Sequence, residues 1–187
     1  LNNKDFDYIE IISKWGNYDI DKLISILKNH QRLRLLYFYG AEKNKVLKDN
    51  KIERQKIVFS SEMKEKHSDF HVNNKYYFKV NITLFCESLF FNNHYNRKVC
   101  ITKEGEIKNC LSLNKTFGYV KNLDSIDRIV QTNDFQLLWN INNDKIKICQ
   151  DCEFRYMCVD NIPLKYENGE WIKTSPCFYN PYNPDDL

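Results

Sequence analysis

Four cysteines near the C-terminal end of the chain have the spacing of a metal or iron–sulfur site. Three lie in the segment Cys149-Gln-Asp-Cys152-Glu-Phe-Arg-Tyr-Met-Cys158, and Cys177 follows beyond a loop. A CxxC pair puts two sulfurs on one tight turn, so both can reach one metal, and the two further thiols complete a set of four ligands. Four thiolates leave the metal no open coordination position. Such a site is structural or electron-transferring.

The same cysteines allow another interpretation, in which they form the disulfides of a small secreted domain. The chain has 187 residues, 42% of them hydrophobic, and an odd number of cysteines, seven. A chain with enough apolar residues for a core and an unpaired cysteine is unlike a small disulfide scaffold, so the sequence favours a metal or cluster site. Zinc and an iron–sulfur cluster both remain candidates at this point.

The other three cysteines have weaker support as ligands. Cys86 and Cys110 are less favoured metal ligands, because a second site would have to combine them with Cys100 and would still have only three thiols. Cys100 lies in an alternating pattern typical of a strand, where a thiol behaves as a small hydrophobic residue. We therefore expect one site. No catalytic residue is assigned, because the sequence has no recognisable nucleophile triad or glycine-rich phosphate loop.

Composition excludes several classes of partner. The net charge is only +3 and the lysines are spread along the chain, which gives no support for nucleic-acid binding. No apolar run approaches the roughly 18 residues of a membrane-spanning helix, and no charged start leads into an apolar signal core. The default expectation is a cytoplasmic protein with no membrane partner.

The first part of the chain has the rhythm of alternating strands and helices, which indicates an α/β fold. The expected elements are a strand at Tyr8–Ser13, a helix at Ile20–Leu27 with Asp19 as N-cap, a strand at Arg34–Tyr39 that ends at Gly40, a polar helix-compatible stretch, and a strand at Lys56–Ser60. The sequence therefore predicts a partial, (β/α) barrel-like parallel unit over residues 1–80.

The second part, residues 81–187, is predicted to be a separate cysteine-rich domain. A strand is expected over Tyr76–Phe85, and Arg97–Thr102 and Glu106–Leu111 are expected to form a hairpin around a turn that contains Gly105. Apolar residues at helical spacing predict a helix over Ser125–Leu138, just before the cysteine series.

The ordered series of segments resembles the SPASM domain, the cluster-binding extension of many radical S-adenosylmethionine peptide maturases. The general resemblance rests on Gly105–Cys110, Phe117–Val120, a helix that ends near Trp139, and the CxxCxxxxxC series. A narrower resemblance is to the maturase of grasp-with-spasm peptide clusters. It rests on Phe85–Ser88, Tyr95–Lys98, Ile107–Cys110, the cysteine series and Tyr179–Tyr182.

The resemblance implies a 4Fe-4S cluster on Cys149, Cys152, Cys158 and Cys177. It also implies an accessory role in the maturation of a ribosomally synthesised, post-translationally modified peptide, in which the chain presents the precursor peptide to an ATP-grasp ligase. Alternatives are the C-terminal part of a radical S-adenosylmethionine maturase whose auxiliary cluster transfers electrons, and a structural zinc-binding interaction module.

Two departures from the family pattern limit what the resemblance implies. SPASM domains of the two-cluster type have another cysteine shortly after the position of Cys158, but this chain has Asn161 in that region. The chain also contains no CxxxCxxC, the triad that holds the cluster which cleaves S-adenosylmethionine, so this cofactor is not supported here. We expect a scaffold without radical chemistry rather than a catalytic half upstream of Leu1, and whether the protein is an enzyme stays open.

Overall fold

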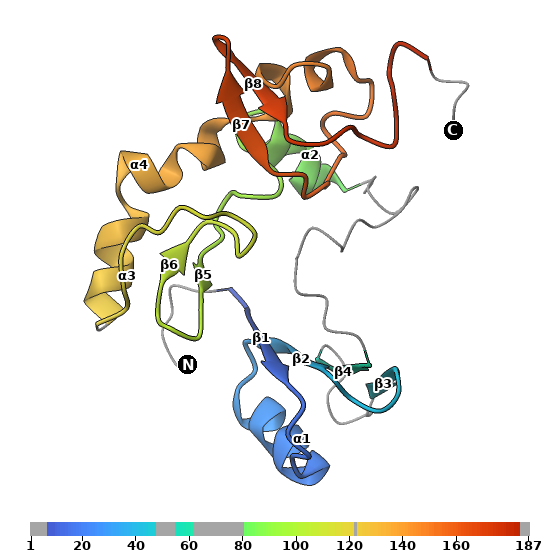
Figure 1. Ribbon diagram of the computed structural model, residues 1–187, viewed down its shortest axis with the longest axis vertical. Helices are drawn as coiled ribbons and strands as arrows, with labels where there is room; N and C mark the ends of the chain where they lie inside the picture. The colour runs from blue at the N-terminus through green and yellow to red at the C-terminus, as the bar shows by residue number, and fades with distance from the viewer. Residues whose placement is uncertain (1–6, 48–54, 62–80, 122, 184–187) are drawn as a thin grey trace. The chain divides into compact units, whose positions relative to one another are not determined.

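The computed structural model describes residues 7–47, 55–61, 81–121 and 123–183 of a mixed α/β protein (Figure 1). The chain divides into two compact units, residues 1–65 and 66–187, which are described separately. The predicted α/β class is confirmed at this level. The predicted domain boundary after residue 80 falls at the end of a segment, 62–80, that is outside the described residues.

Unit 1 contains a four-stranded mixed sheet of order β1-β2-β4-β3. Its parallel strands are β1 (Ile9–Lys14), β2 (Leu33–Tyr39) and β4 (Lys56–Ser60). The predicted strands in this part of the chain are confirmed. The polar stretch expected to be helical instead contains β3 (Lys45–Leu47), which pairs antiparallel with β4 and sets Val46 opposite Val58. Strand pairing therefore outweighs the helix-compatible composition at these three positions.

The helix α1 (Ile20–Asn29) covers one face of this sheet and begins as predicted. The side chain of Asp19 accepts a hydrogen bond from the amide of Asp21 at 2.9 Å, which satisfies one of the free N–H groups of the first turn. The buried residues of the helix, Leu23 and Leu27, belong to a hydrophobic core that also contains residues of β2 and β4. The other members are Leu33, Leu36, Phe38, Ala41, Ile57 and Phe59.

Unit 2 begins, within the described residues, with a helix where a strand was predicted. α2 (Ile82–Ser88) has Asn81 as N-cap, and its side chain accepts from the amides of Thr83 and Leu84 at 2.9 and 3.1 Å. The prediction of a strand over Tyr76–Phe85 is therefore wrong from residue 82 onward, and residues 76–80 are outside the described residues. The predicted hairpin is confirmed in a shorter form, as β5 (Cys100–Ile101) and β6 (Ile107–Lys108).

The single helix predicted over Ser125–Leu138 is divided into three pieces. They are α3 (Leu123–Val130), α4 (Asn133–Gln136) and a 3-10 turn, η3 (Leu138–Asn140). The break lies at Thr132, whose hydroxyl donates to the carbonyl of Ile129 at 2.7 Å and accepts from the amide of Phe135 at 3.2 Å. A threonine that binds backbone groups in this way ends one helix and caps the next.

The C-terminal hairpin was not anticipated from the sequence. Its strands, β7 (Leu164–Glu167) and β8 (Glu170–Lys173), are joined by Asn168 and Gly169, both with positive φ. Asn-Gly between two strands is the preferred type I′ turn, so a local signal was present. The backbone of Trp171 in β8 accepts a hydrogen bond from the amide of Lys147, which ties the hairpin to the chain just before the cysteine series.

Candidate metal and cluster site

The CxxC turn at the start of the cysteine series has a constrained backbone. Cys149 begins a 3-10 turn, η5 (Cys149–Asp151), and the amide of Cys152 donates to the carbonyl of Cys149 at 3.0 Å. The preceding residue, Ile148, has φ 72°, in the left-handed region that β-branched residues rarely adopt. A residue held in such a conformation costs about 1 to 3 kcal/mol, and such residues cluster at functional sites.

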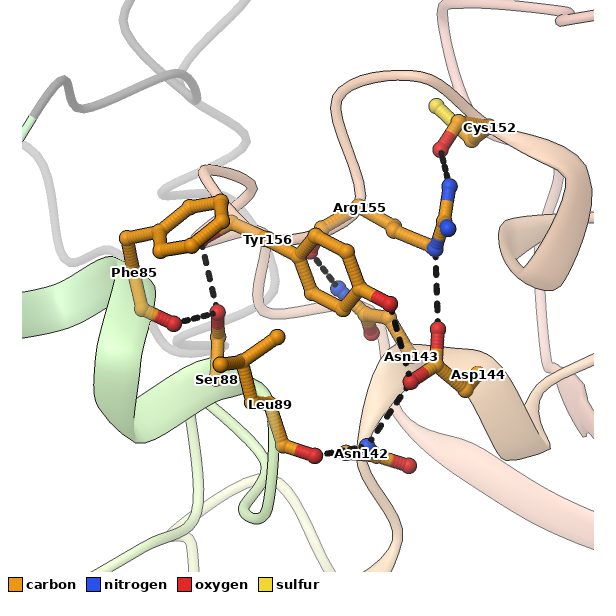
Figure 2. Close-up of polar contacts among 9 residues, drawn as sticks. All are labelled: Phe85, Ser88, Leu89, Asn142, Asn143, Asp144, Cys152, Arg155 and Tyr156. Atoms are coloured by element: carbon orange, nitrogen blue, oxygen red, sulfur yellow. Dashed lines mark hydrogen bonds and ion pairs between the residues drawn. The ribbon is translucent and has the colours of Figure 1, made fainter.

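Arg155 connects this turn to the preceding 3-10 turn, η4 (Asn143–Lys145) (Figure 2). Its guanidinium donates to the carbonyl of Cys152 at 3.0 Å and to a carboxylate oxygen of Asp144 at 2.8 Å. The hydroxyl of Tyr156 donates to the other oxygen of Asp144 at 3.2 Å. The Asn143 amide also donates to the carbonyl of Arg155 at 2.7 Å. The side chains of Arg155 and Tyr156 therefore cap and fix the backbone between the second and third cysteines.

The same segment is joined to α2 by two buried polar side chains (Figure 2). Ser88 Oγ lies 2.7 Å from the carbonyl oxygen of Phe85 and 2.9 Å from that of Tyr156. The amide of Asn142 donates to the carbonyl of Leu89 at 2.8 Å. Ser88 and Asn142 are 2% and 5% exposed, so these hydrogen bonds satisfy polar groups that would be costly to leave unpaired in the interior.

A buried ion pair lies beside the third cysteine. Lys173 Nζ donates to Asp160 Oδ2 at 2.8 Å, and the two side chains are 11% and 7% exposed. The thiol of Cys158 donates to the same oxygen at 3.1 Å, and the amide of Ile162 donates to the other oxygen at 3.0 Å. Lys173 comes from β8, so the ion pair joins the C-terminal hairpin to the cysteine series.

The electrostatic interactions of the thiols show which cysteines share one neighbourhood. Burial raises the pKa of the Cys149 and Cys152 thiols, and the nearby sulfur of Cys177 adds to both shifts. Burial also raises the pKa of Cys158, and Lys173 opposes the rise at all three positions. The structure thus brings Cys149, Cys152 and Cys177 near one another, and Cys149, Cys152 and Cys158 all interact with the same lysine.

All seven cysteines lie in the described ranges and carry free thiols. Cys86, on α2, is exposed, whereas Cys110 is buried and its sulfur lies 3.5 Å from His94 Nε2. Cys100 is half-buried and its thiol donates to the carbonyl of Asn109 at 3.6 Å. The structure therefore gives these three cysteines surroundings different from those of the C-terminal four.

Within residues 7–47, 55–61, 81–121 and 123–183, no group of three or more His, Cys, Asp or Glu side chains is arranged to hold a single metal ion. A tetrahedral zinc site needs its sulfurs about 2.3 Å from one centre, hence nearly in contact. A 4Fe-4S cluster is larger than one ion, so its four thiolates lie farther apart. Free thiols are the donors that either group would require, and all four candidate cysteines carry them.

Several residues around the thiols were missed by the sequence analysis. Asp160 lies two residues after Cys158, whereas Lys173 approaches the thiols from β8, so no local spacing marks the lysine. The hydroxyls of Tyr179 and Tyr182 donate to Glu153 and Asp151, the two carboxylates that flank Cys152. The sequence signals for these contacts are the alternation of acidic residues with cysteine in the CxxC turn and the segment Tyr179–Tyr182, which entered the sequence analysis only through the resemblance.

No described helix has the length and the apolar composition that crossing a membrane requires. The comparisons with known proteins add no assignment: no protein-family model, no curated protein and no solved structure matches this chain.

Proposed function

We propose that unit 2 binds a 4Fe-4S cluster through Cys149, Cys152, Cys158 and Cys177, and that the protein is an accessory factor in the maturation of a ribosomally synthesised peptide. The observation that carries the proposal is the common electrostatic neighbourhood of three free thiols from two distant segments, Cys149, Cys152 and Cys177. The ordered resemblance to SPASM domains supports the choice of cluster and process.

The surroundings of the thiols suit a site whose cysteines must lose their protons when a metal or cluster binds. Thiolates, not thiols, bind iron or zinc, so loading removes up to four protons from these side chains. Burial opposes this ionisation at Cys149, and the ammonium of Lys173 favours it. Lys173 is itself fixed by Asp160, so its charge keeps one position near the sulfurs. When bound, a cluster would supply one-electron chemistry or a rigid link between the segments.

Peptide capture is proposed for the sheet of unit 1. In the part of the chain that the structure describes, β1 lies at one edge of the sheet and pairs only with β2, so its other side presents backbone donors and acceptors. Its residues Ile11 and Ile12 are 39% and 38% exposed. An extended precursor peptide could add to such an edge through main-chain hydrogen bonds, with side-chain contacts to the isoleucines. The bound peptide would then be presented to an ATP-grasp ligase.

Two alternatives make different predictions. A C-terminal part of a radical S-adenosylmethionine maturase requires a CxxxCxxC upstream in the full gene, and sequencing that gene tests it directly. A structural zinc module requires zinc in stoichiometric amount and no iron or sulfide.

Purification without oxygen, followed by metal and sulfide analysis and visible spectroscopy, tests the proposal. We expect iron and acid-labile sulfide in equal amounts, with the broad visible absorption of thiolate-bound clusters. Stoichiometric zinc without sulfide would favour the zinc module. A third outcome is a protein purified in this way that contains neither iron nor zinc and whose thiols do not accept iron and sulfide. That result would contradict both the cluster site and the zinc module.

A further inference from the structure

The last described segment of the chain, residues 177–183, is fastened to the CxxC turn by two tyrosines. We call this segment the C-terminal strap. The hydroxyl of Tyr179 donates to Glu153 and the hydroxyl of Tyr182 donates to Asp151. These two carboxylates are the immediate neighbours of Cys152 in the sequence. The strap begins with Cys177, so both tyrosine contacts hold the segment that carries the fourth candidate ligand.

The conformation of the strap is set locally as well as by these contacts. Tyr179 is 4% exposed, and its ring packs edge-on against Phe154 with a centroid distance of 5.1 Å. The side-chain oxygen of Asn180 accepts a hydrogen bond from the backbone amide of Tyr182 at 3.1 Å. The backbone carbonyl of Asn180 accepts one from the backbone amide of Asn183, also at 3.1 Å. This double turn aims the two tyrosines at the same short stretch of chain.

We propose that Tyr179 and Tyr182 are positioning residues of the cysteine site, which hold Cys177 against the CxxC turn before any cluster is bound. The inference deepens the proposed function and rests on it. A ligand already held in place loses little conformational freedom on binding, so the contacts raise affinity for the cluster without touching it. Neither tyrosine ligates the cluster.

Tyr179→Phe and Tyr182→Phe each remove one hydroxyl and keep the ring. Asp151 and Glu153 are exposed, so neither change buries an unpaired carboxylate, and Tyr182 is itself 64% exposed. The matched control is Tyr166→Phe, in β7, where the ring is 62% exposed and packs on Trp171. With anaerobically loaded protein and a competing iron chelator, we expect each strap variant to lose its visible cluster absorption about 10-fold faster than wild type, and the control to match wild type.

A second measurement uses the metal-free chain and is independent of cluster binding. The reagent dibromobimane becomes fluorescent when it bridges two nearby thiols, and peptide mapping identifies the bridged pair. We expect Cys177 to be bridged to Cys152 or Cys149 more slowly in Tyr179→Phe and Tyr182→Phe than in wild type and in the control, at unchanged unfolding temperature. Equal bridging rates in all four proteins would overturn the positioning role, even if the cluster is present. Slower bridging in the two strap variants, together with a wild-type protein that binds no cluster, would refute the proposed cofactor and leave the strap geometry supported.

Discussion

Lys173 places a positive charge beside three of the four candidate cysteines. Burial alone would hold Cys149, Cys152 and Cys158 as neutral thiols, and Lys173 counteracts that effect at each. Its partner Asp160 prevents the ammonium from being an unpaired buried charge, which would be costly. Individual side chains therefore decide whether the site can be loaded, because ligand charge and burial act in opposite directions at the same atoms.

The ligand assignment predicts that Cys152→Ser lowers bound metal and thermal stability together. A serine hydroxyl does not replace a thiolate on iron or zinc, so metal content should fall to near zero and the unfolding temperature by roughly 5 °C or more. Elemental analysis and calorimetry on the same samples measure both effects.

The matched control is Cys100→Ser, whose thiol contacts a backbone carbonyl that a hydroxyl can also serve. Metal content should stay at the wild-type value in this variant. A loss at Cys100 equal to that at Cys152, or full metal content in Cys152→Ser, would contradict the assignment.

The buried ion pair predicts a large asymmetry between single and double variants. Lys173→Met leaves the Asp160 carboxylate buried without its cation and should reduce the free energy of unfolding of the metal-free protein by about 3 to 5 kcal/mol. The double change Lys173→Met with Asp160→Asn should recover most of this loss, because no unpaired charge remains. Denaturant unfolding of the three proteins and wild type measures the coupling, and a double variant as unstable as the single one would contradict it.

The same pair predicts the direction of pH dependence. Burial opposes ionisation of Asp160, but the charge of Lys173 and the hydrogen bonds from Lys173, Cys158 and Ile162 together lower the pKa of that carboxyl below its usual 3.8. A lowered pKa contributes stability that is present at neutral pH and is lost as the pH falls below about 4. In Lys173→Met this contribution is missing, so the free energy of unfolding should fall less steeply than in wild type as the pH is lowered from neutral to about 3, which urea unfolding at a series of pH values measures. An equally steep fall in both proteins would mean that Lys173 does not lower the pKa of Asp160.

At the scale of elements, the β7–β8 hairpin carries Lys173 to the cysteines, and its turn depends on two residues with positive φ. Gly169 has φ 85°, and a Cβ at this position would meet no atom within 4 Å. The turn therefore needs glycine for its backbone conformation and not for space.

Gly169→Ala should accordingly destabilise the protein by about 1 to 2 kcal/mol through backbone strain alone. Asn168→Gly is the matched control, because glycine adopts the φ of 53° at that position without strain. Urea unfolding compares the two. Equal stability of Gly169→Ala and wild type would show that the turn has another conformation in solution.

At the scale of the whole molecule, the two compact units have separate hydrophobic cores. The core of unit 1 lies between α1 and its sheet, and that of unit 2 includes Tyr95, Cys110, Ile141, Ile146, Cys149 and Leu164. Cys149 thus belongs both to the core of unit 2 and to the candidate site. Binding of the proposed cluster would therefore be coupled to the folding of unit 2.

Residues 66–187 produced alone should therefore bind the same amount of metal per chain as the full protein. All four proposed ligands and the Lys173–Asp160 pair lie within this unit. Metal analysis of the isolated unit beside the full chain, prepared identically, measures this. A folded isolated unit that binds no metal, beside a loaded full chain, would show that unit 1 supplies part of the site.

Local patterns in the sequence were enough to predict much of unit 1, and they are the basis for proposing the four cysteines as a ligand set. The cap at Asp19, the apolar strands β1, β2 and β4 and the CxxC turn each depend on residues within a few positions of one another. Such features are set by backbone hydrogen bonds and side-chain periodicity, which a sequence displays directly. The Asn-Gly turn of the last hairpin was equally local and was overlooked.

The tertiary structure alone decided the features that link distant segments. Residues from Ile82 onward form α2 instead of a strand, and the helix is held by Asn81 at its start and by the contact of Ser88 with Tyr156, 68 positions later. The pairing of Lys173 with Asp160 beside Cys158 likewise depends on how β8 packs. Sequence spacing suggests which thiols can share a site. The charges that surround those thiols are determined by contacts between segments that lie far apart in the sequence.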